Sequence, residues 1–193
     1  MNNEKELTVK EAFDLAIQNH QNNNLQDAQN YYQKVLKIDP NHSAALNNLG
    51  VIFQGLGENQ KAKDCYEKAI EINPNYANAH LNLGVLFKEL GNDQKAKGSF
   101  EKAISIDPRD VKAHNNLGNI FKDLGEYQKA KDCYEKAIKI YPNYTDALDN
   151  LGVIFQGLGE NQKAIECYKR YFARSKNRLC SVWLHVWNSR SWV

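Results

Sequence analysis

The sequence predicts an all-α protein, an α-solenoid of about five antiparallel helix-turn-helix repeats. Its four prolines, which are Pro40, Pro74, Pro108 and Pro142, follow one another at intervals of 34 residues. The stretch NLGVIFQGLGENQKA occurs at 48–62 and again at 150–164, three such intervals later, and KAKDCYEKAI occurs at 61–70 and 129–138. Matching text at multiples of one fixed period is the signature of a repeat array.

The period divides the chain into a lead-in, an array and a tail. Residues 1–8 precede the array, and residues 179–193 follow it with a different composition. The predicted repeats are 9–42, 43–76, 77–110, 111–144 and 145–178. A hairpin of this length cannot bury its own apolar face, so the repeats are expected to stack on one another.

Each repeat has the pattern of two amphipathic helices. In 43–76 the first helix carries apolar residues at three- and four-residue spacing, namely Leu46, Leu49, Ile52, Phe53 and Leu56. Gly57 is expected to end this helix in a left-handed conformation. The second helix carries Ala62, Tyr66, Ala69, Ile70 and Ile72. Pro74 is expected to end it, because proline lacks the amide donor and disfavours helix in the residue before it. Thr8 and Glu11 have the spacing of a capping box for the first helix of the array.

Small residues at fixed positions predict a close contact between the two helices of a hairpin. The first helices carry Gly50, Gly84, Gly118 and Gly152, and the second helices carry Ala62, Ala96, Ala130 and Ala164. Aromatic residues recur in both helices, as Phe53, Phe87, Phe121 and Phe155 and as Tyr66, Phe100, Tyr134 and Tyr168. We expect these rings to fill the space between repeats.

The same residues resemble the tetratricopeptide repeat family. Its motif of leucine, glycine, aromatic, alanine, aromatic, alanine and proline is matched by Leu49, Gly50, Phe53, Ala62, Tyr66, Ala69 and Pro74, with equivalents in 77–110 and 111–144. The resemblance covers residues 9–178. It departs from the motif at Ala16, Asn19 and Val35 in the first repeat and at Tyr171 and Lys176 in the fifth. The family implies a right-handed solenoid that binds a protein or peptide on a concave surface lined by first helices.

A row of asparagines lies at the predicted binding surface. Asn48, Asn82, Asn116 and Asn150 precede the leucine–glycine pair in four successive repeats, and Asp14 takes this place in the first. Asparagine offers a donor and an acceptor, so a row of them could hold the backbone of an extended peptide. The row resembles the asparagine ladder in the repeat region of protein O-GlcNAc transferases. Flanking candidates are Asn47, Asn115, Asp149, Gln54, Lys88, Lys122 and Gln156. The alternative is a neutral polar residue that duplication copied.

Other uses of the fold find less support. A clamp for the carboxylates of chaperone tails needs basic residues where this chain has Phe13, Asn47, Leu81, Asn115 and Asp149, and Lys112 alone fits. His80 and His114 occupy equivalent positions without ligands at metal spacing, so we interpret them as packing residues. No nucleophile–base pair and no phosphate-binding loop is evident. We therefore expect no enzymatic activity, no metal and no cofactor.

Charge and cysteine positions limit the kinds of partner and the cellular location that we expect. The formal net charge is +2, but the basic excess comes from residues after 166, and the rest of the chain is mildly acidic. This argues against nucleic-acid binding. The start lacks a secretory signal and no long apolar run is present, so a cytoplasmic protein is expected. Cys65, Cys133 and Cys167 share one position in different repeats, too far apart for disulfides, and are expected to be free thiols.

The tail, LCSVWLHVWNSRSWV, contains all three tryptophans and no acidic residue. We consider a closing helix on the last repeat, a membrane-surface or partner segment, and a reading frame that ends wrongly inside a sixth repeat. For the array, the predicted function is that of a protein-interaction scaffold. The alternative is the substrate-recognition region of an O-GlcNAc-transferase-like glycosyltransferase without its catalytic domain.

Overall fold

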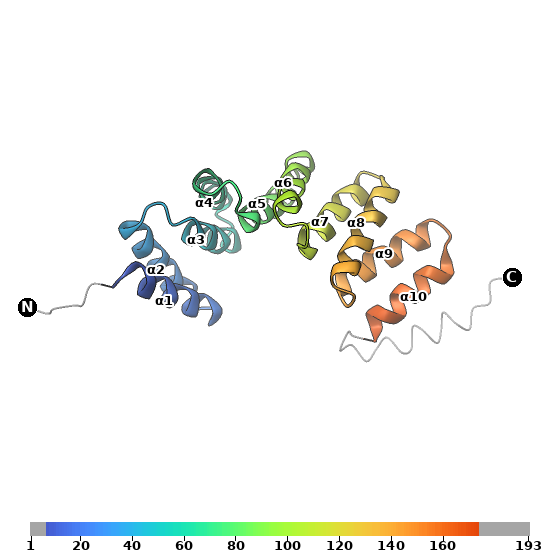
Figure 1. Cartoon of the computed structure of the whole chain (residues 1–193), viewed down its shortest axis with the longest axis horizontal. Coiled ribbons are helices and arrows are strands. Elements are labelled where there is room, and N and C mark those ends of the chain that lie inside the picture. The colour runs from blue at the N-terminus through green and yellow to red at the C-terminus, as the bar shows by residue number, and fades with distance from the viewer. Residues whose placement is uncertain (1–6, 174–193) are drawn as a thin grey trace, which may run out of the picture. The chain divides into compact units, whose positions relative to one another are not determined.

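The computed structural model describes residues 7–173, and within this range it contains ten helices and no strand. The chain divides into two compact units, an N-terminal unit (residues 1–107) and a C-terminal unit (residues 108–193). Figure 1 shows the helices of each unit as successive antiparallel pairs. The prediction of an all-α protein of helical hairpins is confirmed. The tail at 179–193, with its three alternatives, lies outside the described residues.

The N-terminal unit contains three hairpins. Its helices are α1 (Val9–Gln21), α2 (Leu25–Ile38), α3 (Ser43–Gly55), α4 (Asn59–Ile72), α5 (Ala77–Glu89) and α6 (Asp93–Ile106). The most extensive contacts join the two helices of a hairpin, and α2 also packs on α3 and α4 on α5. One such junction buries Leu46 of α3 with Ala69 and Ala79 and partly covers Ile72.

The C-terminal unit contains two hairpins that follow the same plan. Its helices are α7 (Val111–Asp123), α8 (Tyr127–Ile140), α9 (Thr145–Gly157) and α10 (Asn161–Phe172). Here α8 packs on α9 in the way that α4 packs on α5. Pro142 lies between α8 and α9, and the guanidinium of Arg170 on α10 donates to its carbonyl oxygen at 2.8 Å.

The turn inside each hairpin is a Schellman motif. After α3, Gly57 has a φ of +75°, its amide donates to the carbonyl of Gln54, and the amide of Glu58 donates to that of Phe53. These two bonds satisfy carbonyls that a helix end leaves unpaired. Gly91, Gly125 and Gly159 repeat the positive φ. In the first hairpin Asn23 takes the glycine's place with a φ of 60°, which asparagine tolerates better than most residues.

The prolines end the second helices as predicted. Asp39, Asn73, Asp107 and Tyr141 each precede a proline and adopt an extended conformation, with φ between −130° and −122°. Contact with the proline ring disfavours helix at this position. At the start of the array, Thr8 and Glu11 form the expected capping box, in which the amide of Glu11 donates to the Thr8 hydroxyl at 3.2 Å.

The glycines of the first helices lie against the aromatic rings of the second. A Cβ atom added to Gly50 would lie 2.6 Å from Cε1 of Tyr66, and one added to Gly84 would lie 2.6 Å from Cε1 of Phe100. The same distance separates the Gly118 and Gly152 positions from Tyr134 and Tyr168. The sequence analysis expects these rings to fill the space between repeats. The contact with the glycine lies inside the hairpin, where the missing side chain leaves room for the ring.

Candidate peptide-binding surface

The first helices of neighbouring hairpins contact each other in both units. In the N-terminal unit α3 contacts α5, and in the C-terminal unit α7 contacts α9. The side of each unit formed by these helices is called the first-helix face. The predicted asparagines lie on it, at the junctions between one first helix and the next.

In the N-terminal unit the asparagines form a chain of hydrogen bonds. The amide nitrogen of Asn82 donates to Oδ1 of Asn47 at 2.9 Å, and the amide of Asn47 donates to Oδ1 of Asn48 at 3.2 Å. Asn48 in turn donates to the hydroxyl of Tyr32 at 3.2 Å. That hydroxyl lies 3.4 Å from Nδ1 of His20. The chain thus runs from α5 through α3 to the first hairpin.

In the C-terminal unit the equivalent pair is repeated. The amide of Asn150 on α9 donates to Oδ1 of Asn115 on α7 at 3.3 Å. Oδ1 of Asn150 accepts a further bond from the ammonium of Lys122 at 3.1 Å. Asn116 is half-buried, and the described residues give its side chain no hydrogen bond. Two of the four predicted row residues therefore pair with an asparagine of the preceding hairpin, and the pairing residue stands one position before the row.

Two predicted contact residues are buried. Asn47 is 4% exposed and Asn115 is 5% exposed, so neither offers its side chain to a ligand. Both belong to the flanking candidates of the sequence analysis. A buried amide needs partners within the protein, and each of these accepts a bond from the row residue of the next hairpin. Asp149, at the same position in the last described hairpin, is exposed.

The candidates one or two turns further along the first helices differ between hairpins. Oε1 of Gln54 accepts from the Tyr66 hydroxyl at 2.8 Å, and its amide donates to Glu89 at 2.7 Å. Gln156 is exposed and accepts from the Tyr168 hydroxyl at 3.4 Å. Lys88 is half-buried near the end of α5. The surface therefore combines neutral amides with a fixed carboxylate in one unit and a fixed ammonium in the other.

Tyrosine hydroxyls reach this face from the second helices, which the sequence analysis did not predict. The rings of Tyr32, Tyr66 and Tyr134 are buried, while their hydroxyls bond to polar groups of the first helices, as that of Tyr134 does to Asn119 at 2.8 Å. Burial raises the pKa of all three, so they remain neutral hydroxyls. The signal in the sequence is tyrosine rather than phenylalanine at this position, with Phe100 as the exception.

An apolar stripe accompanies the asparagine row. Val51, Val85 and Val153 follow row residues by three positions, which places them on the same side of the helix. Val51 is 36% exposed and Val153 is 46% exposed. Asn119 replaces valine on α7. An extended segment lying along such a face would meet amide groups and apolar side chains together.

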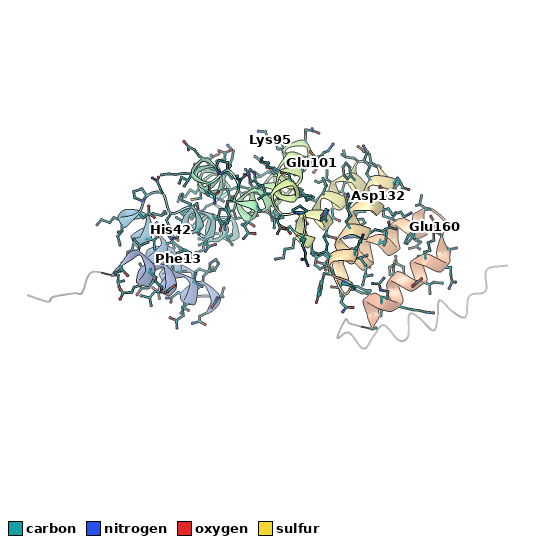
Figure 2. The ribbon with its side chains drawn as sticks, in the orientation of Figure 1. Phe13, His42, Lys95, Glu101, Asp132 and Glu160 are labelled. Carbon is teal, nitrogen blue, oxygen red and sulfur yellow. The ribbon has the colours of Figure 1, made fainter. Side chains whose placement is uncertain are left out.

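The first hairpin closes the face with aromatic contacts. The ring of Phe13 on α1 packs against that of His42, with centroids 4.5 Å apart and ring planes tilted by 43°, and both residues are labelled in Figure 2. Nδ1 of His42 accepts from the amide of Ala45 and so caps α3. Phe13 stands where a chaperone-tail clamp would need a lysine.

The two histidines interpreted as packing residues each bond to a proline carbonyl. Nε2 of His80 lies 3.0 Å from the carbonyl oxygen of Pro74, and Nε2 of His114 lies 3.0 Å from that of Pro108. A carbonyl only accepts, so each ring donates its Nε2 proton. Within residues 7–173 no group of three or more histidine, cysteine or acidic side chains could hold a metal ion.

The state of the cysteines and the length and polarity of the helices also bear on the sequence analysis. Cys65, Cys133 and Cys167 are free thiols, as predicted. In the part of the chain that the structure covers, every helix is too short or too polar to cross a lipid bilayer.

Solved structures with the same architecture are numerous. A crystal structure of MamA is 26% identical with a TM-score of 0.71, and the match covers 86% of this chain and 90% of that one. Pseudomonas aeruginosa pilF is 22% identical with a TM-score of 0.83, covering 91% and 80%. YrrB, described as a TPR protein with an unusual peptide-binding site, is 20% identical with a TM-score of 0.68, covering 91% and 90%. No curated protein sequence matches the chain significantly.

Family models match the chain over most of its length. Three models, each described as tetratricopeptide repeat, match the chain: one at 43–76 and 111–144, a second at 65–98 and 133–168, and a third at 13–55. Together they cover residues 13–98 and 111–168, which is most of the sequence. Repeats of this kind form protein-interaction scaffolds. The chain belongs to the tetratricopeptide repeat family.

Proposed function

We propose that the protein is a non-catalytic scaffold that holds an extended segment of another protein on its first-helix faces. The observation that carries the proposal is the coincidence of amide groups and exposed valines on these faces. Asn82 uses one amide proton internally and keeps a second amide proton and the carbonyl oxygen for a ligand, while Asn48 and Asn150 each keep a second amide proton. A peptide backbone offers the complementary groups at every residue.

The internal hydrogen bonds support this proposal because they fix the amides before a ligand arrives. A free asparagine side chain on a surface loses rotamer entropy when it binds, whereas one that is already held loses less. Asn48 is held by both Asn47 and Tyr32, and Asn150 by both Asn115 and Lys122. Such a face would bind backbone with little demand on sequence, and the valines would favour apolar side chains.

The proposal is tested with two variants of the face. Asn116→Ala removes a row amide that has no hydrogen bond among the described residues, and Val51→Asp places a charge on the apolar stripe. A partner is first captured from native extract with the wild-type chain, and its affinity is then measured by calorimetry. We expect Asn116→Ala and Val51→Asp each to weaken binding severalfold, and the double variant to weaken it further.

A matched control removes an amide elsewhere. Asn161→Ala changes an exposed asparagine at the start of α10, a second helix, and should leave the affinity unchanged. If the Asn116→Ala and Val51→Asp double variant binds the captured partner like the wild type, the first-helix faces are not the binding surface. Circular dichroism checks that all variants keep their helicity.

A further inference from the structure

The ammonium of Lys122 lies among neutral amides. It donates to Oδ1 of Asn150 at 3.1 Å, and Asn150 donates to the buried Asn115. Lys122 is half-buried, and within the described residues it forms no ion pair. A cation that is partly removed from water and bonded only to a neutral oxygen still lacks a countercharge. This is the position on the C-terminal unit's face where a ligand anion would be stabilised.

Several lysines on the second helices form ion pairs with nearby glutamates. Lys61, Lys129 and Lys163, at the start of the second helices, form ion pairs with Glu58, Glu126 and Glu160 respectively. Lys63 and Lys131 pair with glutamates one turn further along their helices. Lys122 is thus set apart from these by its partner, a neutral amide on the next first helix.

The N-terminal unit contains the same site with a different charge. Asn47 and Asn82 match Asn115 and Asn150, and Gln54 stands where the C-terminal unit has Lys122. The amide of Gln54 donates to the carboxylate of Glu89. The residue equivalent to Glu89 in the C-terminal unit is Gly157, which has no side chain to neutralise the lysine. The two units therefore share a pair of amides and differ in the charged group beside it.

We propose that Lys122 and Asn150 form a carboxylate-binding subsite, which selects an acidic side chain or a chain-terminal carboxylate of the bound segment. The inference rests on the proposed peptide-binding function and adds its charge preference. An ammonium and an adjacent amide N–H give a carboxylate two charge-assisted or polar donors. Lys122 also lies in the last turn of α7, where a cation complements the helix dipole. That second role alone would give no preference among ligands.

Three synthetic probes separate these roles. The first is an acetylated and amidated pentapeptide of alternating glycine and valine. The second carries aspartate in place of its central residue, and the third is the first with a free C-terminal carboxylate. Binding to the full chain is followed by NMR through the side-chain amide signals of Asn150 and Asn82. We expect the better carboxylate probe to bind about tenfold more tightly than the neutral one at the Asn150 site. Comparing the second and third probes identifies which carboxylate is preferred.

Substitutions at one residue complete the test. Lys122→Gln introduces the residue found at Gln54 and Gln156, so the fold should accept it, and it should remove the preference while leaving the neutral probe's affinity unchanged. Lys122→Arg should keep the preference. Equal binding of all probes to the wild type would overturn the inference and leave the proposed function standing. A uniform loss with Lys122→Gln would also overturn it and assign Lys122 a structural role. If no probe shifts either amide, the proposed function fails, and the inference with it.

Discussion

The amide nitrogen of Asn82 lies 2.9 Å from Oδ1 of Asn47, and this bond joins α5 to α3 across neighbouring hairpins. Asn47 is almost fully buried, so its carbonyl has no access to water. The bond therefore belongs to the packing between repeats as well as to the surface. It means that the row residues of this chain are not equivalent, because some hold the stack together and others do not.

This difference predicts unequal effects on stability. Asn82→Ala would leave the buried carbonyl of Asn47 without its partner, and we expect it to lower the free energy of unfolding by about 1–3 kcal/mol. Asn116→Ala removes no hydrogen bond among the described residues and should cost far less. Urea unfolding followed by circular dichroism measures both. Equal stabilities for the two variants would contradict the assigned role of the Asn82–Asn47 bond.

Much of the fold could be predicted because its signals are local. Gly57 and Pro74 end helices through their own backbone restrictions, and Thr8 caps α1 with a residue three positions away. None of these depends on how one hairpin meets the next. The fixed period repeats these helix-ending residues along the chain. An element that is unclear in one repeat can therefore be assigned from the equivalent residues of the others.

The site was predicted less completely because it depends on the junctions between hairpins. The sequence places Asn47 beside Asn48 on one helix, yet the first is buried and the second is half-exposed. The bond between Asn82 and Asn47 joins residues 35 positions apart, and the rotation between hairpins sets it. The rotation between hairpins also sets the bond between Lys122 and Asn150. A pattern within one helix contains no information on that rotation.

A second prediction concerns the close contact inside a hairpin. Gly84→Leu would place a side chain where a Cβ alone would lie 2.6 Å from the Phe100 ring. We expect a loss of roughly 1–3 kcal/mol in the free energy of unfolding from overpacking.

The size-matched control for this substitution is Gly98→Leu. Gly98 is exposed within α6, and a Cβ there would meet nothing within 4 Å. Leucine favours helix over glycine by somewhat under 1 kcal/mol, so this variant should gain stability. Denaturant unfolding of both proteins compares them directly. Similar unfolding midpoints for Gly84→Leu and the wild type would rule out the glycine–ring contact.

A third prediction concerns thiol reactivity. Burial, together with a smaller effect of the nearby carboxylate of Asp64, raises the pKa of the Cys65 thiol to about 11. At pH 8 only about one thousandth of it is then thiolate, against about one tenth for a thiol of pKa 9.0. In a Cys180→Ser background, we expect Cys65 to react with a disulfide reagent about a hundredfold more slowly than free cysteine. Mass spectrometry of the labelled peptides locates the reaction. A rate equal to that of free cysteine would show that the thiol is not shielded in solution.

The last prediction follows from the position of His20 at the end of the hydrogen-bond chain. Burial lowers its pKa below 6.5, since the charged ring is poorly solvated beside Tyr32. In the unfolded chain the ring has its ordinary pKa, so below 6.5 the unfolded state binds more protons than the folded one. The free energy of unfolding should therefore rise as the pH increases toward 6.5, and the rise due to His20 should be complete above that pH. The contribution of His20 is the difference between the wild type and His20→Asn. We expect the variant to show a smaller rise in stability between about pH 5 and 7 in urea unfolding. Parallel curves for the two proteins would show that His20 ionises alike in the folded and unfolded states.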